Sequence, residues 1–99
     1  MTNLKPIEIL IYNVLVVTFK NVKYEHLENQ GSGTGYAIKT HKGITLQECA
    51  EYCNKKPTCA GFTYFDDKKC RLKSKFQKQD EIQNDRDSYL KLSGVWLQK

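Results

Sequence analysis

Residues 45–73 read TLQECAEYCNKKPTCAGFTYFDDKKCRLK and contain all four cysteines of this 99-residue chain. A chain of this length forms one small domain, which buries a smaller fraction of its surface than a large domain and often needs covalent cross-links. An even number of cysteines in such a chain predicts a disulfide framework, and disulfides persist outside the reducing cytosol. The cysteine cluster therefore predicts a small, disulfide-stapled domain of an extracellular or secreted protein.

A helix that begins after Thr45 is the clearest local element of this stretch. The Thr45 hydroxyl is placed to cap the helix, and the Glu48 side chain can reach back to the Thr45 amide in a capping box. Apolar residues follow at positions i, i+3, i+4 and i+7, which predicts one stripe facing a core. Pro57 and the two lysines before it end the helix. The stripe consists of Leu46, Cys49, Ala50 and Cys53.

Two strand-like segments follow the helix, at residues 60–65 and 70–76, and a polar turn at residues 66–69 joins them. Cys59 comes just after the helix exit, and Cys70 opens the second segment. Both are therefore candidate partners for the two cysteines of the helix. Four cysteines allow three connectivities, however, and the spacing alone does not choose among them.

Further from the cysteines, residues 22–27 and 36–40 are strand-like, and the glycine-rich residues 29–35 between them predict a flexible loop. This loop lacks the lysine and the following apolar helix of a nucleotide-binding loop. We therefore expect no nucleotide, and no other cofactor is indicated.

The apolar run PIEILIYNVLVVTF lies within residues 1–21 and has two interpretations. Glu8 and Asn13 interrupt it and no small-x-small cleavage site follows, which favours a strand or two short strands over a degenerate signal peptide. The run is also too short and too polar to span a bilayer, so no membrane span is expected. On the strand interpretation, an export signal is missing from this chain, or the chain is a piece of a longer protein.

The central stretch resembles a PAN/apple domain. Members of that family include the N-terminal domains of plasminogen and hepatocyte growth factor, the apple repeats of coagulation factors, leech antiplatelet protein and apicomplexan microneme adhesins. The resemblance rests on the capped helix with its two cysteines, the P-x-C of residues 57–59, the aromatic strand AGFTYF and the C-x-L-K of residues 70–73. SYLKL at residues 88–92 resembles the closing strand of such domains. The similar segment spans residues 22–92 and leaves residues 93–99 as a tail.

This resemblance implies an α+β fold in which a curved antiparallel sheet cradles one helix. It also implies nested disulfides, Cys49 with Cys70 and Cys53 with Cys59, and we favour that pairing because it tethers the helix to a strand and closes the helix exit. The chain lacks the extra terminal cysteine pair of the six-cysteine apple subtype and is more similar to the shorter PAN type. Because family members bind proteins or carbohydrates, the resemblance implies an extracellular recognition module in adhesion or attachment.

A basic stretch suggests which ligand such a module would take. Every charged residue between positions 68 and 78 is basic, and those from 69 to 75 alternate with other residue types. On a strand this alternation predicts a row of cations on one face, which suits a polyanion such as heparin or another sulfated glycosaminoglycan. The alternative is an ordinary solvated face, since edge strands commonly carry lysine. Acidic residues between positions 80 and 87 would neutralise part of the row if that segment folds back. The candidate ligand-binding residues are Lys68, Lys69, Arg71, Lys73, Lys75 and Lys78.

Other classes of function find less support. Exposed aromatics do not interleave with the basic row, which argues against nucleic acid. The spacing C-x3-C-x5-C-x10-C lacks the C-x2-C knuckles usual for zinc. His26 and His41 have no nearby carboxylate cluster in the sequence and are expected at the surface. No nucleophile motif is present, so we do not expect an enzyme.

The leading hypothesis is therefore an extracellular PAN/apple-like module that binds a protein or a sulfated carbohydrate, as a monomer or as one module of a larger ectodomain. The rival hypothesis is a small secreted inhibitor or effector that blocks a host protein through the same scaffold. A zinc-binding domain is a third alternative, which free thiols would favour.

Overall fold

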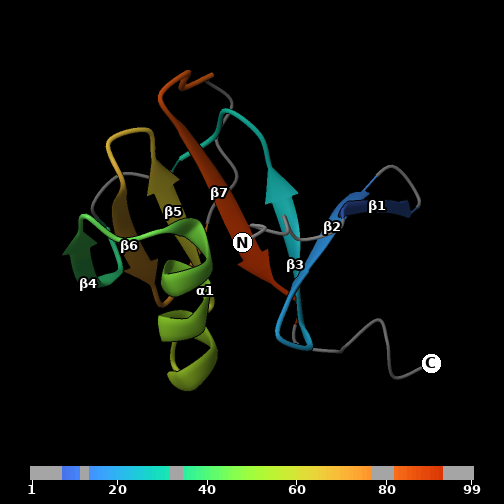
Figure 1. Ribbon diagram of the computed structural model, residues 1–99, viewed down its shortest axis with the longest axis horizontal. Helices are drawn as coiled ribbons and strands as arrows, with labels where there is room; N and C mark the ends of the chain where they lie inside the picture. The colour runs from blue at the N-terminus through green and yellow to red at the C-terminus, as the bar shows by residue number, and fades with distance from the viewer. Residues whose placement is uncertain (1–7, 12–13, 32–34, 77–81, 93–99) are drawn as a thin grey trace, which may run out of the picture.

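The computed structural model describes residues 8–11, 14–31, 35–76 and 82–92 (Figure 1). Antiparallel strands form one seven-stranded sheet in the order β1-β2-β3-β7-β5-β6-β4, and a single helix packs on it. This arrangement confirms the α+β class. The elements are β1 (Glu8–Ile11), β2 (Val14–Phe19), β3 (Val22–Leu27), β4 (Ala37–Lys42), α1 (Leu46–Lys55), β5 (Gly61–Phe65), β6 (Lys69–Lys73) and β7 (Arg86–Lys91).

Helix α1 forms where the local signals predict it. The Glu48 amide donates to the Thr45 hydroxyl at 3.1 Å, and the Thr45 amide donates to the Glu48 carboxylate at 2.8 Å, so the capping box is complete. The buried residues Cys49, Ala50 and Cys53 form the stripe that contacts β2, β5 and β6. The helix thus covers one face of the sheet, as Figure 1 shows.

Two disulfides join the helix to its surroundings. Cys49 is bonded to Cys70, which ties α1 to β6, and Cys53 is bonded to Cys59, which closes the helix exit. This is the nested arrangement that the family resemblance implied. All four sulfurs are buried in the core, and none of the cysteines is free.

Aromatic rings fill the space between the helix and the sheet. Phe19, Tyr24, Phe62 and Tyr89 come from four different strands and pack with ring centroids 4.9–6.2 Å apart. Edge-to-face and offset contacts of this kind add to the hydrophobic gain of burying the rings. The core is therefore built from residues that lie far apart in the chain.

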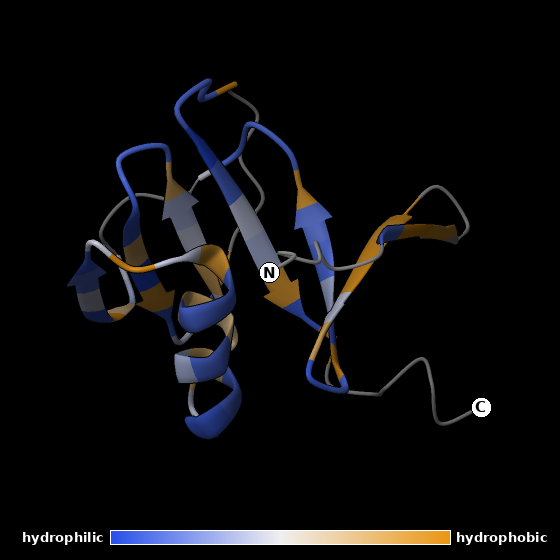
Figure 2. Ribbon diagram, viewed as in Figure 1, coloured by the Kyte–Doolittle hydropathy of each residue, from blue (hydrophilic) through white to orange (hydrophobic). Residues whose placement is uncertain are grey.

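The N-terminal apolar run forms strands β1 and β2, which extend the sheet at one end. Figure 2 shows that these two strands are among the most hydrophobic parts of the ribbon. This outcome agrees with the strand interpretation of the run. Within the described ranges, no helix is long and apolar enough to cross a membrane.

The second hairpin differs from the sequence prediction at its end. Strand β6 stops at Lys73, whereas the sequence predicted a strand through residue 76. The chain bends because the Ser74 amide donates to the carbonyl of Tyr36 at 2.9 Å, after which the Phe76 ring lies against Gly61. Lys75 is therefore outside the strand.

Candidate anion-binding surface

Part of the predicted basic row lies on the sheet face opposite the helix. Cys70 points toward α1, to which its sulfur is bonded, so Lys69 and Arg71 point away from the helix. Both cations lie over the ring of Phe65 on the neighbouring strand β5. The Lys69 Nζ atom is 4.4 Å from the ring centroid, and the Arg71 Cζ atom is 5.0 Å from it.

A third cation, which the sequence analysis missed, joins this group from β7. Arg86 is the register partner of Phe65, and its Cζ atom is 4.6 Å from the ring centroid. We call Lys69, Arg71, Arg86 and Phe65 the Phe65 cation cluster. Attraction between each cation and the aromatic face offsets part of the repulsion among the like charges. The signal in the sequence was weak, because Arg86 lies within an acidic stretch.

Carboxylates beside the cluster moderate its charge. Arg86 donates from Nε and Nη2 to the two oxygens of Asp85, at 2.8 and 3.2 Å. Hydrogen bonding from Arg86, with help from the charge of Lys69, lowers the pKa of Asp85. The Lys69 amide also donates to Asp67, at 3.2 Å. The described part of the acidic segment therefore folds back beside the basic surface.

Lys73 does not belong to this surface, which corrects the predicted row. Its relative exposure is 1%, and burial followed by the charge of Arg71 lowers its pKa. Lys73 is flanked in the sheet by Ala37 and Gly61, and the Phe76 ring lies over Gly61 beside it. Strand β6 is an interior strand of the sheet, and the edge beside it is β4.

The remaining predicted cations are dispersed. Lys75 is exposed and its Nζ atom lies 5.4 Å from the ring centroid of Tyr36, which is also exposed. Lys68 lies in the turn before β6, where its carbonyl accepts from the amides of Gly43 and Ile44. Lys78 lies outside the described residues. The structure thus groups only Lys69 and Arg71 among the predicted residues.

His26 also departs from the sequence expectation of a surface residue. Its side chain is 8% exposed and its ring stacks on Tyr89, with centroids 4.4 Å apart. Nδ1 lies 2.6 Å from Glu8, and Nε2 lies 2.8 Å from Asp87. Local sequence patterns could not predict these contacts, because both carboxylates are remote from His26 in the chain. Burial alone would lower the pKa of His26, but the hydrogen bonds and charges of Asp87 and Glu8 outweigh burial and raise it.

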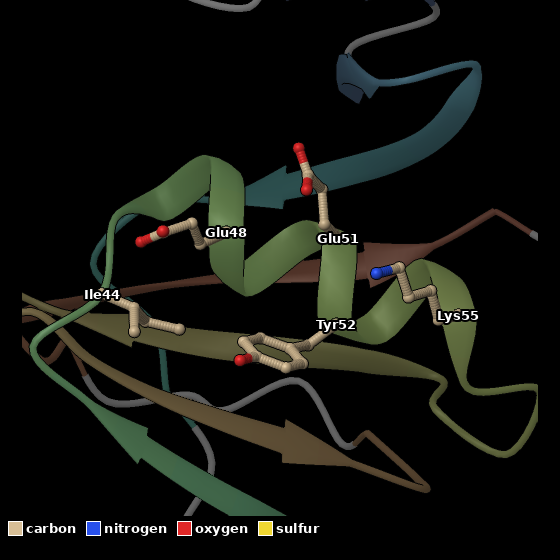
Figure 3. A pocket seen from close by; sticks show the side chains of 5 residues that line it. All are labelled: Ile44, Glu48, Glu51, Tyr52 and Lys55. Atoms are coloured by element: carbon tan, nitrogen blue, oxygen red, sulfur yellow. The ribbon is translucent and has the colours of Figure 1, made fainter.

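A hollow of about 200 Å³ lies beside α1, and Tyr52, which lines it, is also the stacking partner of His41 (Figure 3). The two ring centroids are 4.0 Å apart, and burial followed by the charges of Lys39 and Lys56 lowers the pKa of His41. The rim of the hollow mixes carboxylates with an ammonium group, so it favours no single charge of ligand. Ile44, Glu48, Glu51, Tyr52 and Lys55 line it.

No metal site emerges from these groups. The disulfides use all four thiols, which overturns the tetrathiolate zinc alternative. Across the described ranges, no group of three or more histidine, cysteine, aspartate and glutamate side chains is arranged to hold a metal ion.

In the described part of the chain, one helix is joined by nested disulfides to an antiparallel sheet, which defines a small disulfide-stapled domain. A family model described as PAN domain matches residues 18–93. The chain therefore belongs to the PAN domain family, as its resemblance predicted. No curated protein and no solved structure matches it. PAN domains are binding modules for proteins or carbohydrates, and their disulfides are typical of extracellular proteins.

Proposed function

We propose that this protein is a non-enzymatic, extracellular recognition module that binds a sulfated carbohydrate or an anionic surface of a protein in adhesion or attachment. The observation that supports this proposal is the Phe65 cation cluster, in which cations from two strands converge on one ring. Most charged side chains of a small domain spread apart in water. Here three cations are held together on the face opposite the helix.

The chemistry of the cluster suits sulfate groups. A guanidinium presents a planar fork that donates two parallel hydrogen bonds to one oxyanion, whereas a lysine acts as a point charge. Arg71 and Arg86 would therefore orient a sulfate or carboxylate. Lys69 would attract the same anion electrostatically without fixing its orientation. An incoming anion has to compete with Asp85 for the guanidinium of Arg86. Binding should also weaken as salt is added, because the cations are only partly buried and salt screens their attraction for the anion.

The test is retention on immobilised heparin, with fully desulfated heparin as the reference polymer. Arg71→Gln and Arg86→Gln each remove one charge from the cluster, and Lys55→Gln removes one charge from α1 on the other side of the sheet. We expect each arginine variant to bind heparin at least about tenfold more weakly and the Lys55 variant to match the wild type. Each variant must keep both disulfides and the circular dichroism spectrum of the wild type, which shows that it is folded.

Two results would overturn the proposal. Wild-type protein that does not distinguish heparin from the desulfated polymer has no sulfate site. A Lys55→Gln loss as large as the Arg71→Gln loss would show that only the net charge matters. Salt-insensitive binding to one host protein, without heparin retention, would favour the inhibitor or effector hypothesis instead.

A further inference from the structure

Strand β1 forms one end of the seven-stranded sheet, and β2 is the one strand that pairs with it among the residues that the structure describes (Figure 1). Edge strands leave a row of backbone donors and acceptors without a strand partner, and they invite pairing with another chain. The side chains of β1 add to this tendency, because Ile9 and Leu10 are 54% and 62% exposed. They belong to the hydrophobic end of the ribbon in Figure 2.

The opposite edge, β4, is protected against such pairing. Lys39 and Lys42 are exposed on it, and the register shifts between Ala37 and Lys39 in a bulge. Charged side chains and bulges are common means by which proteins block edge-to-edge association. Strand β1 has only one charged residue, Glu8, and that carboxylate faces His26 within the same sheet, at 2.6 Å.

We propose that β1 is a homodimer interface, at which it pairs antiparallel with β1 of a second copy of the chain. A twofold axis perpendicular to the sheet, centred on Ile9, would place Ile9 opposite Ile9 of the second copy and Glu8 opposite Leu10 of the second copy. No like charges then oppose one another, and aliphatic side chains meet across the axis.

If two copies associate, the distribution of charge favours contact at this end of the sheet. The formal net charge of the chain is +5, so two copies repel each other overall. The Phe65 cation cluster and the lysines of β4 lie toward the other end, separated from β1 by β2 and β3. Contact through β1 therefore keeps the most basic surfaces of the two copies far apart.

The β1 strand also lies outside the PAN match, which begins at residue 18. This interface is accordingly a property of the chain's own N-terminal strands, and it does not depend on the proposed anion site. The sequence analysis expected a monomer or one module of a larger ectodomain, and the proposed interface adds a weak dimer to these. A four-residue edge buries little surface, so we expect association in the micromolar range or weaker.

Sedimentation velocity of the full chain, from low micromolar to millimolar concentration, measures this equilibrium. Ile9→Lys places a charge at the centre of the interface, and Leu10→Lys does so on the other face of the same strand. Ile82→Lys is the matched control, because Ile82 is 74% exposed and precedes β7, which β2 and β3 separate from β1. We expect both β1 variants to raise the dimer Kd at least about tenfold, and the control to leave it unchanged.

Added NaCl supplies a second readout. Salt screens the repulsion between two basic copies, so dimerisation through β1 should strengthen as NaCl is raised. A wild-type protein that stays monomeric at millimolar concentration would overturn the proposal. A dimer that NaCl weakens, or that survives both Ile9→Lys and Leu10→Lys with unchanged Kd in folded protein, would equally overturn it by placing the interface elsewhere.

Discussion

The imidazole of His26 on β3 lies 2.8 Å from the carboxylate of Asp87 on β7, and the other ring nitrogen faces Glu8 on β1. One side chain therefore links three strands of the sheet. Only the protonated imidazole can donate to both carboxylates, since the neutral ring has a single N–H. The contact consequently makes the stability of the sheet depend on pH.

The first prediction concerns that dependence. The folded-state pKa of His26 is raised above the ordinary value of 6.5, so its contribution is fully present below 6.5 and is lost as pH rises through the folded pKa. A hydrogen bond from His26 lowers the pKa of Asp87 below 3.8, so that contribution is present above 3.8 and is lost as pH falls through the lowered pKa. Urea unfolding should therefore show maximal stability between these limits.

NMR titration of the His26 ring provides the direct measurement, with a midpoint expected above 6.5. His26→Gln should remove the loss of stability on the alkaline side while the variant stays folded. A midpoint at or below 6.5 would show that burial outweighs the two carboxylates.

The second prediction compares the two disulfides. Cys49 and Cys70 are 21 residues apart, whereas Cys53 and Cys59 are 6 apart. Loop-closure entropy makes the longer cross-link the more stabilising one, by about 1 kcal/mol. Replacing both cysteines of each pair by alanine should therefore lower the free energy of unfolding by about 2–4 kcal/mol for the first pair and less for the second. Equal losses in urea titrations would contradict this chain-entropy account.

The third prediction concerns Gly61 on β5, whose Cβ position is closely approached by the Tyr89 carbonyl and the Phe76 ring. A Cβ atom there would lie 2.3 Å from the Tyr89 carbonyl oxygen and 2.8 Å from the Phe76 ring. Gly61→Ala should lower the free energy of unfolding by about 1–3 kcal/mol or more, because the backbone oxygen cannot move aside cheaply. Gly35→Ala is the control, since nothing lies within 4 Å of its Cβ position. Similar stabilities of the two variants in urea unfolding would refute the close approach.

The fourth prediction concerns the polar link between the sheet and the helix. The buried Tyr24 hydroxyl donates to Asn54 at 2.5 Å, and the Asn54 amide donates to the carbonyl of Phe19 at 3.0 Å. Tyr24→Phe should cost about 1 kcal/mol in unfolding free energy, and Asn54→Ala should cost more because it removes both bonds. A larger loss for Tyr24→Phe than for Asn54→Ala, measured by thermal or urea unfolding, would contradict this ranking.

Sequence reasoning succeeded where one short segment carries all the information. The capped helix from Leu46 to Lys55 follows from Thr45, Glu48 and the apolar stripe, whose interactions span one or two turns. The alternation at Lys69 and Arg71 also holds, because side chains on a strand point to alternate faces. Beyond Lys73, the chain bends to contact residues far away, and a local rule could not anticipate that.

The sequence by itself determined the capped helix and the alternation of the basic strand, since these patterns act over a few residues, and its resemblance to the PAN family implied the disulfide-stapled α+β module. Only the tertiary structure decided which distant side chains meet. The sheet order placed β5 between β6 and β7, which brought Arg86 to Phe65 and buried Lys73 in an interior strand. It also brought Glu8 and Asp87 to His26. Such contacts depend on the register of strands paired across the whole chain, which no local pattern specifies.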